Sequence, residues 1–213
     1  MLKRILATVG ALMLFVSPAV FAQTDSPVSI LENATNEALR ELNRNHGEIR
    51  KDINKLYDLV DRLVFPLVDF EAMSKLVLGK HWKKATPEQR QRFMDAFAKM
   101  LKYTYTRSLR DYTDQEIRYF PNKTQIKGRY ASVYSEFVPG GGKPNVPVVY
   151  KLRKSKDGKW KAYNLIIDNL SMVKNYRTDF SREIREKGLD SLIDRLEKEQ
   201  EEQKRLAEAG KDR

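Results

Sequence analysis

The chain has 213 residues, of which 41% are hydrophobic and 32% charged, and its formal net charge is +11. This length fits one large domain or two small ones, and the hydrophobic share is too high for a disordered protein. The absence of cysteine excludes disulfides, thiol nucleophiles, iron–sulfur clusters and cysteine-based zinc sites. The positive charge alone would indicate a nucleic-acid-binding protein, but the first 22 residues argue against that class.

The N-terminal segment has the pattern of a secretory signal peptide. Lys3 and Arg4 precede a 12-residue apolar run, residues 5–16, and small residues lead to Ala22. The run is shorter than the roughly 20 residues that a membrane-spanning helix needs. We therefore predict cleavage after Ala22, with an N-terminal membrane anchor as the alternative. A lipoprotein is excluded, because its lipid would be attached to a cysteine.

Removal of residues 1–22 would leave 191 residues with a net charge of +9. The signal is of the bacterial type, so we expect the protein in the periplasm, where nucleic acid is not an expected partner. A basic surface there would meet anionic lipid, the cell wall or an acidic protein. Since no disulfide can form, we expect the hydrophobic core alone to hold the fold together.

The first half of the predicted mature chain, residues 23–110, has the spacing of helices. Apolar residues at steps of three and four predict helices over 27–42 and 49–64. A polar break at residues 45–47 is expected to separate them. Ser26 can cap the first of these helices, and a proline follows it at the first helical position.

Two further helices are predicted in the same half. Asp69 can cap a short helix, and Gly79 stands where its C-terminal cap belongs. Thr86 and Gln89 have the spacing of a capping box, in which each side chain bonds the other residue's backbone N–H. We expect the helix that this box opens to run to about Leu109.

Residues 111–168 have the two-residue period of strands. A strand around Ile117 precedes predicted strands over 124–138, 146–152 and 159–168, and the last three are expected to form an antiparallel meander. Consecutive apolar residues near the end of the last strand place apolar side chains on both faces of the sheet. This pattern fits helices on both faces, or a sheet curved around a ligand.

Residues 169–200 are predicted to form closing helices, with Ser171 as the cap of the first and Gly188 as its end. Residues 201–213 are nearly all charged or glutamine, so a disordered tail is expected there. No composition shift or linker divides residues 23–200. The order of helices, sheet and helices predicts one α+β domain.

The residues that usually carry catalysis are sparse. The two histidines, His46 and His81, have no metal-ligand spacing and are expected to be solvent-exposed. Asp168 is the strongest acid–base candidate, and the alternative is that it shapes a turn. Two basic segments, residues 80–84 and 151–161, are either solvated faces or patches for anionic headgroups or an acidic partner. The first contains a tryptophan, a residue favoured at membrane interfaces.

Three segments resemble the signatures of a known family. They are residues 69–82 (DFEAMSKLVLGKHW), residues 166–177 (IIDNLSMVKNYR) and residues 188–193 (GLDSLI), in the order and spacing that the family shows. On this basis the chain is similar to the MlaC family, also called the toluene-tolerance family, over nearly all of its predicted mature length. Asn169 stands where glycine is common in the family, and asparagine also tolerates the positive φ that such a turn needs.

The resemblance implies an α+β fold with an NTF2-like curved antiparallel sheet wrapped by helices. It implies a soluble periplasmic carrier whose cargo is a phospholipid and which needs no metal or cofactor. Its partners would be an inner-membrane MCE-domain ABC transporter complex and an outer-membrane lipoprotein–porin complex. Together they would maintain the lipid asymmetry of the outer membrane, and the carrier itself is expected to be monomeric.

The acyl chains would lie in an apolar cavity between the sheet and the helices, with the phosphate near its mouth. Two alternatives remain open at this point: a small enzyme on the same fold, for which Asp168 would be required, and an adaptor that bridges membrane complexes without carrying lipid. The residues predicted to line the cavity are Phe97, Met100, Leu101, Val148, Tyr150, Leu165, Ile167, Met172, Val173 and Tyr176.

Overall fold

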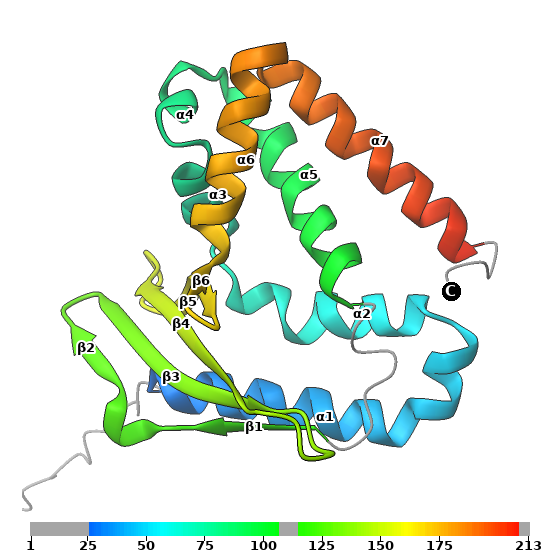
Figure 1. The fold of residues 1–213 in the computed structure, drawn as a ribbon, viewed down its shortest axis with the longest axis vertical. Coiled ribbons are helices and arrows are strands. Elements are labelled where there is room, and N and C mark those ends of the chain that lie inside the picture. Colours follow the sequence, from blue (N-terminus) through cyan, green and yellow to red (C-terminus); the bar gives the residue numbers. More distant parts are fainter. Residues whose placement is uncertain (1–25, 107–114, 209–213) are drawn as a thin grey trace, which may run out of the picture.

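The computed structural model describes residues 26–106 and 115–208. Its first part is helical, as the apolar spacing predicts, and the helices are connected by short turns (Figure 1). The elements are α1 (Pro27–Lys51), α2 (Asn54–Leu63), the 3₁₀ turn η1 (Phe65–Leu67), α3 (Phe70–Leu78), α4 (Lys80–Lys84) and α5 (Pro87–Thr106).

The caps read from the sequence are present. The Ser26 hydroxyl accepts a hydrogen bond from a first-turn N–H of α1, and the Asp69 carboxylate accepts one from the N–H of Ala72 in α3. The capping box of α5 is complete, because the N–H of Gln89 donates to Thr86 Oγ1 at 3.1 Å and the N–H of Thr86 donates to Gln89 Oε1 at 3.0 Å. These contacts span three residues, so the local sequence is sufficient to specify them.

The predicted break at residues 45–47 is wrong, because α1 continues through it to Lys51. A glycine inside a helix costs about 1 kcal/mol relative to alanine, which packing can offset. Leu42 precedes the predicted break and Ile49 follows it, and both are buried against α2 in a shared apolar cluster. Tertiary packing therefore carries the helix across the polar segment.

The second part of the described chain is an antiparallel sheet in the order β1-β3-β4-β5-β6, and β2 pairs with the N-terminal half of β3 on the same edge as β1. The predicted meander is confirmed, but the single strand expected over 124–138 is two strands, because Gly128, with φ +57°, turns the chain between them. The strands are β1 (Glu116–Tyr119), β2 (Gln125–Lys127), β3 (Tyr130–Val138), β4 (Val146–Lys154), β5 (Trp160–Ile167) and β6 (Leu170–Ser171), with a 3₁₀ turn η3 (Pro121–Lys123) after β1.

Two helices close the chain, α6 (Met172–Lys187) and α7 (Leu189–Glu208). Ser171 caps α6 and Gly188 ends it, as predicted. The expectation of disorder from residue 201 is wrong for residues 201–208, which continue α7. Gln200 is buried and donates its side-chain amide to the Ala96 carbonyl oxygen of α5 at 2.8 Å, so contact with α5 supports this charged end of α7.

The molecule has two neighbouring parts (Figure 1). A bundle of α3, α5, α6 and α7 encloses the largest apolar core, and the sheet forms a second core with α1. The predicted α+β class, with an open, curved antiparallel sheet and surrounding helices, is confirmed. The predicted end of the α5 helix at Leu109 and the predicted start of the sheet at residue 111 lie outside the described residues.

Candidate functional site

The register of the sheet brings four of the ten predicted lining residues together. Val148 on β4 pairs with Ile167 on β5, and Tyr150 pairs with Leu165. Because side chains alternate between the faces of a strand, all four point to the same face. This is the face on which α1 packs, since Leu31 of α1 lies in one cluster with sheet residues that include Tyr150. We call it the inner face.

The inner face is closed by α1 at one end and more open at the other. Leu152 and Ala162, near the start of β5, are buried in the cluster with α1. Towards the end of β5, the side chains of Leu165 and Ile167 are only half-buried. Val148, on the neighbouring strand β4, is buried, with 8% of its surface exposed. Large apolar side chains that stay partly exposed on the helix-covered side of a sheet are suited to contact an apolar ligand.

The polar groups on this face are held neutral. The Tyr119 and Tyr150 rings stack with their centroids 6.1 Å apart, and the Tyr119 hydroxyl lies 2.7 Å from Thr35 Oγ1 of α1. Burial raises the pKa of both phenols. The buried Ser135 hydroxyl donates to the carbonyl oxygen of Val148 at 3.3 Å. The inner face therefore presents no charge among these residues at neutral pH.

The other six predicted lining residues lie in the helical bundle rather than on the sheet. Phe97 is 1% exposed, and its ring contacts those of Tyr176 and Phe180 at 5.3 and 6.0 Å, so it is an interior residue of the bundle. Leu101 and Val173 are also buried, whereas Met100, Met172 and Tyr176 are half-buried at the margin of this core. The ten residues thus form two groups, one on each side of the boundary between sheet and bundle.

The two groups are joined where β6 leads into α6. Asn164 of β5 donates its side-chain amide to Ser171 Oγ at 3.0 Å, and its carbonyl oxygen accepts from the N–H of Val173 at 3.1 Å. These bonds fix the first turn of α6 against the edge of β5. Met172 and Val173 are therefore the members of the bundle group that lie nearest the sheet in the chain.

Tyr105, which helical spacing places on the apolar face of α5 but which is not among the ten predicted lining residues, lies beside the bundle group. Its hydroxyl lies 3.1 Å from that of Tyr176, and its side chain is 42% exposed near the end of α5. The pKa of Tyr176 is raised by burial. Tyr105 follows Phe97 and Leu101 at steps of four residues, so the three side chains lie on the same side of α5.

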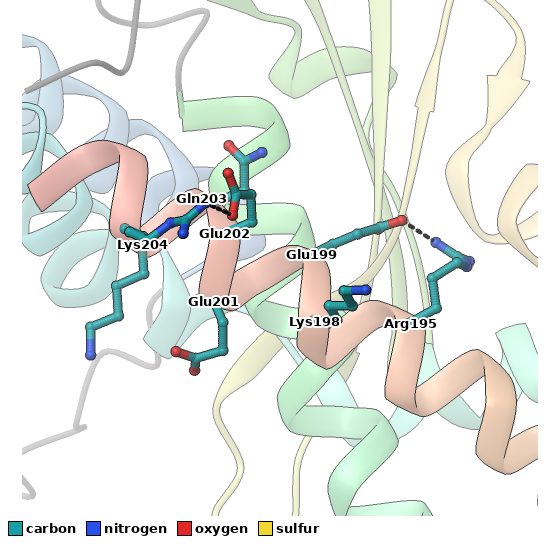
Figure 2. A pocket seen from close by; sticks show the side chains of 8 residues that line it. Arg195, Lys198, Glu199, Glu201, Glu202, Gln203 and Lys204 are labelled. Atoms are coloured by element: carbon teal, nitrogen blue, oxygen red, sulfur yellow. Dashed lines mark hydrogen bonds and ion pairs between the residues drawn. The ribbon is translucent and has the colours of Figure 1, made fainter. Parts of the chain in front are cut away.

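Three hollows of the described surface, all beside α7 or α6, have a different character. One of about 810 Å³ is lined by eight residues of α7, seven of them labelled in Figure 2, and all are charged or glutamine. Another, of about 490 Å³, includes Met100 and Tyr176 but is otherwise bordered mainly by charged residues of α6 and α7. Neither of these, nor a third between α5 and α7, includes a strand residue. The apolar cavity between sheet and helices stays a prediction.

The surroundings of the other candidate residues, Asp168 and the two histidines, decide between the interpretations that the sequence allowed. Asp168 and Asn169 have φ of +48° and +62° and form the two-residue turn between β5 and β6, where Asp168 is exposed, so the turn interpretation is confirmed. His46 and His81 are half-buried rather than exposed, and Nε2 of each has no hydrogen-bond partner among the residues that the structure describes. Burial, followed by Lys80, Lys84 and Arg185, lowers the pKa of His81.

Trp82 is buried, not available at the surface of its basic segment, with the Arg90 guanidinium 5.4 Å from its ring centroid. A membrane-interface role for this tryptophan is therefore not supported. Within residues 26–106 and 115–208, no cluster of histidine and acidic residues could hold a metal ion, and no helix is long and apolar enough to cross a membrane.

Comparison with known proteins gives consistent matches. The sequence model of the family described as MlaC protein matches residues 32–198. Toluene tolerance protein ttg2D of Pseudomonas putida is 32% identical over 189 residues, which cover 87% of this chain and 86% of that protein. The intermembrane phospholipid transport system binding protein MlaC of Haemophilus influenzae is 25% identical over 183 residues, 85% of each chain.

A solved structure shares the fold over most of its length. It is the phospholipid-binding protein of Ralstonia solanacearum in complex with a phospholipid, which superposes with a TM-score of 0.73 at 26% sequence identity. The match covers 82% of this chain and 97% of that one. The likeness therefore includes both the sheet and the helical bundle.

Proposed function

The chain belongs to the MlaC family, and from that premise we propose that it is a phospholipid carrier. The observation that carries the proposal is the shared fold with a solved protein that holds a phospholipid, over 97% of that protein's chain. We propose carriage rather than catalysis, because Asp168, the strongest acid–base candidate of the sequence, is exposed in a turn.

A carrier is needed because a phospholipid in water is costly. A diacyl lipid that leaves a bilayer exposes on the order of thirty methylenes, each costing about 0.8 kcal/mol, so the total is roughly 24 kcal/mol. Free diffusion between two membranes is therefore negligible. An apolar interior replaces most of the lost environment, and binding becomes an exchange between two apolar phases.

The acyl chains are proposed to lie between the inner face of the sheet and the helical bundle. The half-buried Leu165 and Ile167 supply apolar surface on the sheet side, and Met172 and Tyr176 supply it at the start of α6. Val148 and Tyr150 complete the sheet side, whereas Phe97 and Leu101 back the helices from within the bundle. The phosphate would stay at the mouth, beside lysine or arginine.

The setting of this activity is proposed from the signal pattern and the family. Cleavage after Ala22 would release the chain into the periplasm as a monomeric shuttle. It would receive or deliver lipid at an inner-membrane MCE-domain ABC transporter complex and an outer-membrane lipoprotein–porin complex. The sequence contains no P-loop motif, so we propose that the partner complexes provide the direction of transport.

The test is lipid content combined with one matched pair of variants. Wild-type protein, purified gently in its processed form, should yield phospholipid on solvent extraction and mass spectrometry. Ile167→Trp adds bulk on the inner face and should lower the recovered lipid several-fold. Ile166→Trp adds the same bulk to the neighbouring residue, which points to the opposite face, and should keep wild-type content.

Two results would contradict the proposal. Recovery of no phospholipid from the wild-type protein would contradict the proposal that the protein carries lipid. Equal lipid content in the Ile167→Trp and Ile166→Trp variants, with circular dichroism showing that both are folded, would contradict the proposal that the inner face binds the lipid.

A further inference from the structure

The positive charge of the chain is concentrated in the sheet. Residues 123–161, which include β2, β3 and β4, contain ten lysines and arginines and two acidic residues, Glu136 and Asp157. Outside this segment and the first 22 residues, 28 basic residues stand against 27 acidic ones. The excess charge that the sequence presents as a global property is therefore local to one part of the fold.

The register collects much of this charge at one end of the sheet. Lys127 on β2 pairs with Tyr130 on β3, Tyr130 with Arg153 on β4, and Arg153 with Lys161 on β5. The four side chains form a row across four strands, on the face opposite to the one that α1 covers. Arg129 and Lys156 lie in the turns at the same end. We call these six residues the basic end.

The face that bears the basic end is open to solvent. Tyr130 is 50% exposed, and its ring meets that of Tyr163 edge-to-face at 6.2 Å. Further along the same face Val149 and Ile166 are half-buried. None of the side chains of β3, β4 and β5 that point to this face is buried. The apolar pattern of the last strand predicted either helices on both faces of the sheet or a sheet curved around a ligand. The described residues do not show helices covering both faces.

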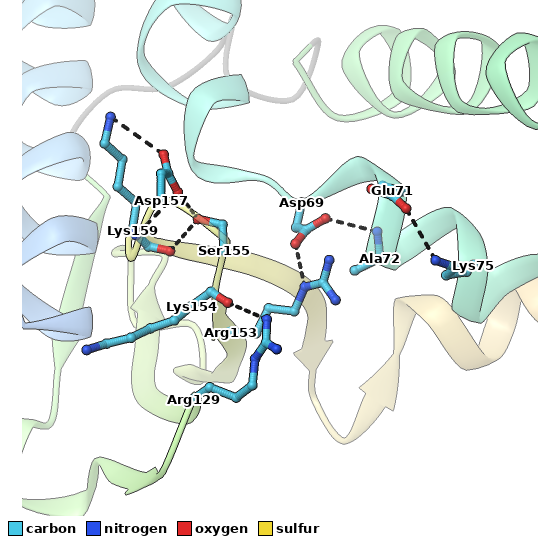
Figure 3. Close-up of polar contacts among 10 residues, drawn as sticks. All are labelled: Asp69, Glu71, Ala72, Lys75, Arg129, Arg153, Lys154, Ser155, Asp157 and Lys159. Carbon is cyan, nitrogen blue, oxygen red and sulfur yellow. Dashed lines mark hydrogen bonds and ion pairs between the residues drawn. The ribbon is translucent and has the colours of Figure 1, made fainter.

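The basic end is held in place by its own contacts (Figure 3). The Arg129 guanidinium donates to the carbonyl oxygen of Lys154 at 2.8 Å, which ties the β2–β3 turn to the end of β4. Arg153 forms an ion pair with Asp69, the cap of α3, which is only 9% exposed. These bonds position the β2–β3 turn and the Arg153 side chain, and Lys127, Lys156 and Lys161 lie at the same end of the sheet as the exposed Tyr130.

We propose that the basic end docks the protein on an anionic phospholipid bilayer. Dispersed lysines suit the diffuse negative charge of a lipid surface, because each contributes without a specific partner. Tyrosine prefers the level of the headgroups, where its ring is half-immersed and its hydroxyl stays wet. This surface lies on the opposite side of the sheet from the proposed acyl-chain site, so docking and lipid occupancy can be measured separately.

The experiment is flotation of the processed protein with vesicles at low salt. One set contains phosphatidylglycerol and phosphatidylcholine in equal parts, and the other contains phosphatidylcholine alone. The triple variant Lys127→Gln, Lys156→Gln, Lys161→Gln removes three cations and keeps most of each aliphatic stem. The matched control Lys83→Gln, Lys174→Gln, Lys198→Gln makes the same change of net charge at exposed positions of α4, α6 and α7.

Wild-type protein should float with the anionic vesicles and not with the neutral ones. A lysine near an anionic surface strengthens binding about fivefold, so the triple variant should bind roughly a hundredfold more weakly, whereas the control keeps wild-type binding. At about 1 M salt, where the Debye length is about 3 Å, binding should be lost. Extracted lipid content should be unchanged in the triple variant.

The proposal is overturned if wild-type protein does not float with anionic vesicles, the result expected if the basic end serves an acidic protein instead. It is equally overturned if the triple variant and the control lose binding to the same degree. Circular dichroism and unfolding temperature establish that both triple variants are folded. Lipid extraction reports on carriage independently, so failure of docking leaves that proposal intact.

Discussion

Gly79 joins α3 to α4 in a backbone conformation that other residues avoid, which makes Gly79→Ala an informative perturbation. Its φ and ψ are +54° and −117°, and its N–H donates to the Lys75 carbonyl oxygen at 3.0 Å as the cap of α3. A Cβ placed there would lie 2.9 Å from Nη2 of Arg177, which reaches across from α6.

The expected cost follows from these two features. A positive φ at a residue with a Cβ costs about 1–3 kcal/mol. The contact with Arg177 adds little, because the atom that must move is the end of a flexible side chain. We therefore expect Gly79→Ala to lower the free energy of unfolding by about 2 kcal/mol, which for a chain of this size lowers the midpoint by about 4–8 °C.

The assay is thermal and urea unfolding followed by circular dichroism, with two further variants. Gly47→Ala lies within α1, where an added Cβ meets nothing within 4 Å, and should raise stability by about 0.5–1 kcal/mol. Arg177→Ala combined with Gly79→Ala should remain less stable than Arg177→Ala alone by the same 2 kcal/mol or so. The reasoning is refuted if Gly79→Ala matches the wild type, or if the double variant recovers the loss.

Two smaller effects on stability follow from single contacts. Thr86→Ala removes the hydroxyl that caps α5 and should cost about 1 kcal/mol in urea unfolding; no change would mean that water replaces the cap. The Arg195 guanidinium, hydrogen-bonded to Glu183 at 2.7 Å, lowers the pKa of that carboxyl from 4.5, so the pair stabilises the fold above pH 4.5 and loses this effect as pH falls through the folded-state pKa. Glu183→Gln should therefore cost up to about 1 kcal/mol at pH 7 and almost nothing at pH values well below that pKa, and an equal loss at both would contradict the pairing.

The features that sequence reasoning predicted well are those decided within a few residues. The caps at Ser26, Asp69, Thr86 and Ser171 are all present, because a cap bonds a backbone group three positions away. Asn169 keeps its turn at positive φ for the same local reason. The family motifs also extend over such short segments, so the resemblance could be found without the fold.

The features that sequence reasoning missed depend on contacts between distant segments. A break was predicted at residues 45–47 because these residues are polar. The segment is nevertheless helical, because Leu42 and Ile49 on either side of it are buried against α2. The charged end of α7 read as disordered, although Gln200 is buried against α5. In both places a neighbouring helix supplies stability that the segment's own composition does not indicate.

The predicted lining residues show where this boundary lies within the candidate site. Alternation within a strand was sufficient to group Val148 with Tyr150 and Leu165 with Ile167, since strand period determines the face, whereas the register that brings the two pairs together is a tertiary property. Helical spacing placed Phe97 on the apolar side of α5 but could not tell the bundle core from the side towards the sheet. A helix can pack against more than one apolar neighbour, and only the tertiary structure shows which neighbour each apolar side chain contacts.

By itself, the sequence determined the family, the capped helices, the antiparallel meander and the sign of the net charge. Only the tertiary structure decided which face of the sheet meets α1, which apolar residues are interior, and that the excess charge gathers at one end of the opposite face. The physical reason is that propensity and capping act over three or four residues. Pairing register and packing act across the whole chain, between residues as distant as Lys127 and Lys161 on β2 and β5.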